Sequence, residues 1–137
     1  MVRWLMIVVA IFGASGVAIG AAGAHALPIL LGGRGLDAAE VSKEIERVET
    51  GVRYQLFHTV ALLCLSLSPA TQNSRLLKLS ATAMCVGILL FSGGLFYHVF
   101  FNNAPVMKIV PYGGTLMIAS WIGLGLSAIF YSGKQNN

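Results

Sequence analysis

The chain has 137 residues, of which 56% are hydrophobic and only 10% are charged, and its formal net charge is +4. A soluble domain carries about 25% charged residues, and a chain of this length has room for only one domain. So much apolar surface excludes an ordinary soluble fold and indicates that lipid is the solvent, in agreement with a mean hydropathy of +0.77. The basic residues are not clustered, which argues against a nucleic-acid partner.

Four uncharged stretches predict four membrane-spanning helices. They lie between Arg3 and Arg34, Arg53 and Arg75, Lys78 and Lys108, and Lys108 and Lys134. Each is long enough for a span of roughly 20 residues, and a backbone inside lipid has to bond internally, which favours helices. We therefore predict an all-α integral membrane four-helix bundle, a single domain over 1–137, with spans at about 4–24, 52–67, 79–101 and 109–131.

The first span has some features of a signal peptide, because Arg3 precedes it and AHAL at 24–27 has the small residues of a cleavage site. The apolar core of a signal peptide is only about 7–15 residues long, and this uncharged run reaches well past Ala24. We expect the segment to be retained as an anchor. Basic residues divide almost evenly between the two sides, and the short loop that holds Arg75 and Lys78 favours cytoplasmic termini.

Residues 37–50 form the one long polar stretch between spans. Asp37 and Glu40 have the spacing of a capping box. Apolar residues recur three or four positions apart on one face, at Ala38, Val41, Ile45, Val48 and Val52. We predict an amphipathic connecting helix that ends near Gly51. It either lies on the membrane surface or covers the ends of the spans.

The second span opens with the polar sequence YQLFH at 54–58. Polar side chains in lipid face the interior of a bundle, and ionisable ones are candidate functional residues. Because the chain reverses at each crossing, we expect one polar cluster in a single half of the membrane, beside His98. Its members are His25, Tyr54, Gln55, His58 and Tyr97.

We expect His58 to face the first span and to hydrogen-bond to another helix. This bond either holds the helices together or belongs to a binding site, since a neutral imidazole can also accept a proton or bind a metal. No carboxylate lies in any span and no His/Cys spacing matches a metal motif, so we predict no catalytic residue, no metal site and no cofactor. We interpret Cys64 and Cys85 as unpaired packing residues.

Small residues predict close helix contacts. Gly16 and Gly20 form a GxxxG pair, a pattern that lets two helices approach closely in lipid. No strand precedes these glycines, which argues against a nucleotide-binding loop. The expected helix-packing residues are Gly16, Gly20, Gly23, Gly93, Gly113 and Gly114. The expected partners are the lipid bilayer and a second copy that packs through these faces.

Four motifs in order resemble one known family: GAAGAHAL, YQLFHTVALL, FSGGLFY and PYGGTLMIASW. The chain resembles the domain-of-unknown-function family 423, small bacterial inner-membrane proteins with animal relatives called transmembrane protein 256. The resemblance covers nearly the whole chain and implies a multi-pass, four-helix protein of the inner (plasma) membrane with no assigned activity. Its pattern falls on Gly23, His25, Tyr54, Gln55, His58, Ser92, Gly93, Tyr97, Pro111, Gly113, Gly114 and Trp121. The acidic helix and His98 depart from that pattern.

Three functions are compatible with these observations. The leading hypothesis is a non-enzymatic packing or assembly protein. The second is a carrier or small-molecule binder with a polar site lined by His25, Tyr54, Gln55 and His58. The third is a metal- or haem-assisted membrane oxidoreductase that uses the histidines. A wet cavity reaching the histidines would favour the second hypothesis, and a dry packed bundle would favour the first.

Overall fold

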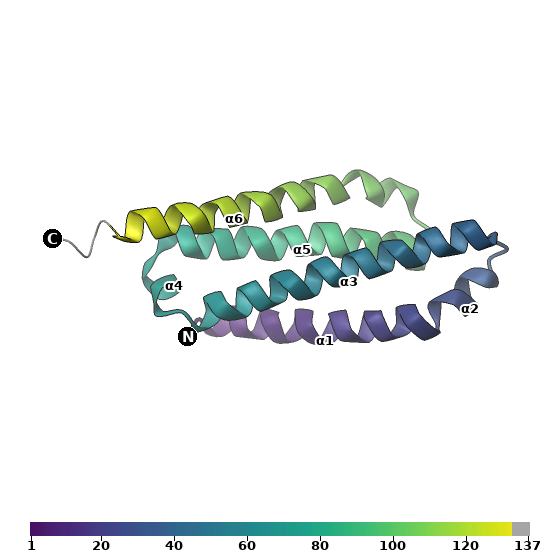
Figure 1. The fold of residues 1–137 in the computed structure, drawn as a ribbon, viewed down its shortest axis with the longest axis horizontal. Helices are drawn as coiled ribbons and strands as arrows, with labels where there is room; N and C mark the ends of the chain where they lie inside the picture. Colours follow the sequence, from purple (N-terminus) through teal and green to yellow (C-terminus); the bar gives the residue numbers. More distant parts are fainter. Residues whose placement is uncertain (133–137) are drawn as a thin grey trace.

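The computed structural model of the chain describes residues 1–132 and confirms the all-α class. Its long helices are α1 (Arg3–His25), α3 (Ala38–Leu67), α5 (Arg75–Phe101) and α6 (Val110–Ser132). They alternate in direction, so that the start of α1 and the end of α6 lie at the same end of the molecule (Figure 1). The short elements between them are α2 (Leu27–Gly32), α4 (Pro69–Asn73) and the 3-10 helix η1 (Ala104–Lys108).

Three segments are long and apolar enough to cross a membrane, judged by length and composition: Arg3–His25, Arg75–Phe101 and Ala104–Phe130. They correspond to the expected first, third and fourth spans. Within residues 1–132, α3 is the one long helix that does not meet this hydropathy level, because its first half is charged.

The expected break between a connecting helix and a second span is wrong, because α3 is one continuous helix of 30 residues. Gly51 lies inside it rather than ending it. A Cβ at Gly51 would lie 2.5 Å from the Phe96 ring, so this glycine permits a close contact between α3 and α5. The capping box expected at Asp37 and Glu40 is present at the start of α3.

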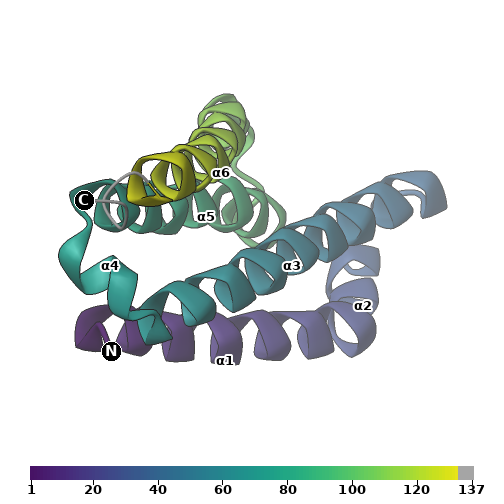
Figure 2. The same ribbon diagram turned by 60° about the vertical axis from the view of Figure 1, so that its left-hand side comes forward.

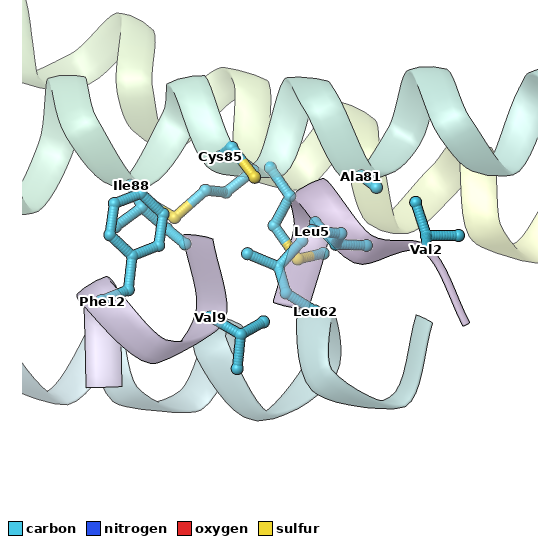
Figure 3. Packing of buried hydrophobic residues seen from close by; sticks show 10 residues of the cluster. Val2, Leu5, Val9, Phe12, Leu62, Ala81, Cys85 and Ile88 are labelled. Atoms are coloured by element: carbon cyan, nitrogen blue, oxygen red, sulfur yellow. The ribbon is translucent and has the colours of Figure 1, made fainter. Parts of the chain in front are cut away.

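The larger core cluster takes side chains from all four long helices (Figure 3). Its buried members are Val2, Leu5, Val9, Phe12, Leu62, Ala81, Met84, Cys85, Ile88 and Met117. Van der Waals packing drives helix association in lipid, since lipid tails are as apolar as the side chains themselves. This cluster therefore joins α1 to α5 and α6 in the half of the molecule that contains both Met1 and the end of α6.

A second cluster lies at the opposite end, where α2 turns away from α1 and packs beside the start of α3 (Figure 2). Its buried members are Leu27, Leu31, Val48, Phe96 and Val99. The expected apolar stripe contributes Val41 and Ile45 to its margin. The first half of α3 therefore packs against α2 and the end of α5. Of the two expected arrangements, this one is closer to a helix that covers the ends of the spans than to a helix that lies alone on the membrane surface.

Several expected packing glycines lie at helix contacts within the chain. A Cβ at Gly23 would lie 3.3 Å from Val48, and one at Gly20 would lie 3.4 Å from Val52. These glycines of α1 are therefore covered by α3 and do not form a free face for a second copy. Gly113 of α6 packs on the backbone of α5, and a Cβ there would lie 2.8 Å from the carbonyl oxygen of Gly87.

The prediction that Gly93 packs closely against another helix is wrong, because a Cβ at this position would meet nothing within 4 Å. Its neighbour Gly94 makes the close contact instead, where a Cβ would lie 2.8 Å from Val110. Adjacent helical residues differ by about 100° in direction, so only one of the two can face α6. The packing at Gly114 is less tight than at Gly94, since a Cβ there would make an ordinary van der Waals contact with the Phe91 ring, at 3.7 Å.

We predict opposite effects for two glycine substitutions. Gly113→Ala should lower the free energy of unfolding in detergent by about 1–3 kcal/mol, because it overpacks a backbone contact. Gly93→Ala is the matched control and should be neutral or stabilising by up to about 1 kcal/mol, because alanine favours a helix and finds open space. Thermal unfolding of the two variants measures the difference. Equal midpoints would contradict the α5–α6 contact.

Candidate functional site

Gln55 connects the middle of α3 to the middle of α1. Its side-chain amide donates to the carbonyl oxygen of Phe12 at 2.7 Å and to the hydroxyl of Ser15 at 2.8 Å. Gly16 makes room for this contact, because a Cβ there would lie 3.3 Å from the amide nitrogen. Both amide N–H groups are therefore satisfied inside the protein, as a donor in a low-dielectric medium requires.

His58 connects α3 to α6. Its Nε2 accepts a hydrogen bond from the indole nitrogen of Trp121 at 3.1 Å, and its Nδ1 lies 2.7 Å from the carbonyl oxygen of Tyr54. A carbonyl only accepts and an indole N–H only donates, so these partners assign the neutral imidazole with the proton on Nδ1. Both ring nitrogens of His58 are thus occupied by groups of the same chain.

The expected orientation of His58 towards the first span is wrong, although a hydrogen-bond partner on another helix is present. Residues three positions apart on a helix differ by about 60° in direction. Gln55 takes the side that faces α1, and His58 takes the side that faces α6. The next residue, Thr59, lies opposite Gly13. His58 is therefore level with the middle of α1 rather than with its His25 end.

A shallow groove lies beside this hydrogen bond, with a volume of about 390 Å³. Its lining comes from α3, α5 and α6 and consists of Tyr54, His58, Phe91, Gly114, Met117, Ile118 and Trp121. The Tyr54 ring is 4.9 Å from Phe91, measured between centroids, and is stacked at 6.0 Å on His58. The groove thus offers aromatic faces and the hydroxyl of a partly exposed tyrosine.

The remaining members of the expected polar cluster lie apart from these sites. His25 is exposed at the end of α1. Tyr97 is exposed on α5, where its ring lies 4.8 Å from that of Phe101 between centroids, at an interplanar angle of 33°. The structure therefore brings Tyr54 and His58 together, directs Gln55 to another helix and leaves His25 and Tyr97 outside, so the single cluster is not formed.

Sequence reasoning missed a charged cleft of about 590 Å³ at the end where α2, the start of α3 and the end of α5 meet. We call it the cap cleft. Its lining residues are Leu31, Arg34, Leu36, Glu40, Lys43, Glu44, Arg47, His98, Val99, Phe100, Phe101 and Asn102. Arg34 donates to the carbonyl oxygens of Val99 at 2.7 Å and Phe100 at 2.6 Å, so its charge lies at the negative end of α5.

Three titratable side chains meet on one wall of the cap cleft. Glu44 pairs with Arg47, one helical turn further along α3. Arg47 also lies 3.1 Å from Nε2 of His98, whose Nδ1 is 3.1 Å from the carbonyl oxygen of Asn103. The second carboxylate oxygen of Glu44 is buried without a hydrogen-bond partner, although Nε2 of His98 is 3.6 Å away.

One sequence signal pointed to this cleft. The acidic helix and His98 are the two features that depart from the family pattern. The structure places them in contact. Their pairing required the register between α3 and α5, which no local pattern gives. Neither in this cleft nor elsewhere among residues 1–132 do three His, Cys, Asp or Glu side chains come together in a way that could hold a metal ion.

The fold and these sites define a class: a small helical protein with three candidate membrane spans, in which polar side chains join the helices. The family described as "Protein of unknown function (DUF423)" matches residues 19–114. The chain belongs to this family, as the four motifs predicted.

Relatives cover nearly the whole length of the chain. The "UPF0382 membrane protein" of Haemophilus influenzae is 38% identical over 116 residues, which are 85% of this chain and 86% of the relative. The "UPF0382 inner membrane protein YgdD" of Escherichia coli K12 is 32% identical over 93% of this chain and 90% of its own. The "UPF0382 membrane protein YwdK" of Bacillus subtilis is 29% identical over 84% of this chain and 87% of its own length. No solved structure matches the chain.

We predict that His58 and Trp121 are energetically coupled. A double-mutant cycle with His58→Ala and Trp121→Phe should give a coupling free energy of about 0.6–2 kcal/mol, the range for hydrogen bonds between membrane helices. Trp121→Phe keeps one aromatic ring and removes the N–H donor together with the rest of the five-membered ring of the indole. Chemical unfolding in mixed micelles measures the four free energies. Strictly additive effects would contradict the hydrogen bond.

Proposed function

We propose that this chain is a four-span, non-enzymatic packing protein of the inner membrane, whose intramembrane polar side chains hold its helices together. The observation that carries the proposal is that both amide N–H groups of Gln55 and both ring nitrogens of His58 are bonded to groups of the same chain. A catalytic base, a proton carrier or a metal ligand needs a nitrogen lone pair free to react. The lone pair of His58 is on Nε2 and is directed at Trp121.

Under this proposal α3 is the fourth span. It lies beside α1 over nearly the full length of that helix, from the contact of Gly23 with Val48 to the hydrogen bond from the backbone of Val2 to that of Ser66 at 2.8 Å. The segment of α3 that crosses the membrane then runs from about 48 to 66. It begins about four residues earlier than the second span expected from the sequence, 52–67, and these added residues lie towards the charged first half of α3. Glu49 and Arg53 are exposed there, close enough to the end of α1 for their charged groups to reach the interface.

A small-molecule binder is the second candidate, and the groove beside Tyr54 supports it. The hydroxyl of Tyr54 makes no hydrogen bond to any described residue, and the groove opens on the side of the bundle between α3 and α6. A ligand dissolved in the membrane with a carbonyl or hydroxyl group would fit this lining. The groove differs from the predicted site, because His25 and Gln55 do not line it.

A topology experiment tests the fourth span. In a background with Cys64 and Cys85 replaced by alanine, Ala39→Cys and Asn73→Cys should react with a membrane-impermeant maleimide from opposite sides of the membrane. Lys108→Cys should behave like Ala39→Cys, and Lys78→Cys like Asn73→Cys, since these exposed positions lie at the matching ends of the helices. Labelling of positions 39 and 73 from the same side would show that α3 does not cross.

A pair of adjacent substitutions separates packing from binding. Gln55→Ala should lower the free energy of unfolding by about 1 kcal/mol, because it removes the hydrogen bonds between α3 and α1. Tyr54→Phe should leave stability unchanged and should not alter the small molecules that co-purify in mild detergent. Mass spectrometry of the extract identifies the small molecules that co-purify with each variant. Loss of a stoichiometric small molecule from Tyr54→Phe, at unchanged stability, would identify a binder and reject the packing proposal.

A further inference from the structure

The cap cleft holds a carboxylate oxygen that lacks a donor. In Glu44, Oε1 pairs with Arg47, while Oε2 is buried and has no hydrogen-bond partner. A buried carboxylate oxygen without a donor is costly, since desolvation is then not compensated. Glu44 lines the open cleft, so a group that enters with an N–H donor would satisfy this oxygen once the carboxylate turns towards the opening.

His98 does not supply the missing donor in the observed arrangement. The carbonyl of Asn103 only accepts, so the Nδ1 of His98 carries the proton. Its Nε2 then presents a lone pair, which accepts from the guanidinium of Arg47 at 3.1 Å. That lone pair and Oε2 of Glu44, 3.6 Å apart, are both acceptors. In the observed arrangement, none of the three side chains donates to Oε2 of Glu44.

The same cleft also presents a cation without a partner. Lys43 lines the cleft, is exposed and makes no hydrogen bond or ion pair with any described residue. Arg34 adds a second positive charge, held in place by the carbonyls at the end of α5. Of the other charges in the lining, Arg47 is paired with Glu44, and the Glu40 carboxylate accepts from the backbone N–H of Asp37. The cleft therefore combines one acceptor in need of a donor with the positive charges of Lys43 and Arg34, which is the complement of a zwitterion that carries both an ammonium and a phosphate.

The depth and lining of the cleft match a lipid headgroup. The cleft lies at the end of α5, which is one of the candidate spans, and thus at the level where lipid headgroups begin. Leu36, Phe100 and Phe101 supply an apolar margin beside the charges. Basic pockets between membrane helices bind the phosphates of anionic lipid headgroups, and Lys43 and Arg34 can hold a lipid phosphate in the same way.

We propose that the cap cleft binds the headgroup of a zwitterionic phospholipid with a primary amine. The ammonium donates to Oε2 of Glu44, and the phosphate lies against Lys43 and Arg34. A primary ammonium is required because a quaternary one has no N–H to donate. This site is separate from Gln55, His58 and the groove at Tyr54, so it does not depend on the packing proposal.

Native mass spectrometry of the full chain in detergent tests the site, with phosphatidylethanolamine, phosphatidylcholine and phosphatidylglycerol of identical acyl chains as probes. Phosphatidylethanolamine should be retained most strongly. Glu44→Gln should reduce its retention roughly tenfold, the value of one charge-assisted hydrogen bond. Glu49→Gln is the control, because it removes the same charge from an exposed position of α3 outside the cleft and should leave retention unchanged.

Lys43→Gln provides a second variant that does not disturb the Glu44–Arg47 pair. It should weaken retention of phosphatidylethanolamine and phosphatidylcholine alike, since both carry the phosphate. Equal retention of the three lipids by the wild-type chain, or retention unaffected by Lys43→Gln, would overturn the proposal. Competition by soluble phosphoethanolamine at the same concentration as the lipid would also overturn it, because the site would then recognise a free headgroup rather than a membrane lipid.

Discussion

The bonds from Gln55 to the backbone and side chain of α1 are the constraint on which the rest of the structure depends. They fix the register between a polar helix and an apolar one where neither water nor lipid can supply a partner. With α3 held in that register, Val48 lies on Gly23, Ser66 lies on Val2, and His58 turns towards α6. A shift of one residue would break all of these contacts together.

Small residues make this arrangement possible by letting the backbones approach. Gly16 leaves the space through which the Gln55 amide reaches the carbonyl of Phe12, and Gly51 on the other side of α3 receives the ring of Phe96. One helix thus packs closely against two neighbours. The same glycines that suggested contact between copies are used within the chain, so an assembly of several copies would have to use other surfaces.

The polar groups of the protein divide by depth into two kinds. In the middle of the long helices, the amide N–H groups of Gln55 and the ring nitrogens of His58 are all bonded within the chain and connect neighbouring helices. At the end formed by α2, α3 and α5, the charges around Glu44 are only partly paired and face an open cleft. Polar groups buried between packed helices have to find partners within the protein, whereas groups that line an open cleft can also bond to a molecule that enters it.

The sequence by itself determined the helical class, the membrane location, three of the four long apolar segments and the family, because composition, hydropathy and ordered motifs are local properties. It also determined the start of α3, since the Asp37–Glu40 capping box involves only four consecutive residues. Only the tertiary structure decided that α3 continues through Gly51, that His58 meets Trp121, and that His98 meets Arg47. The physical reason is that each of these depends on the rotation and register of one helix against another. Those are set by contacts between residues far apart in the chain, which periodicity along a single helix cannot specify.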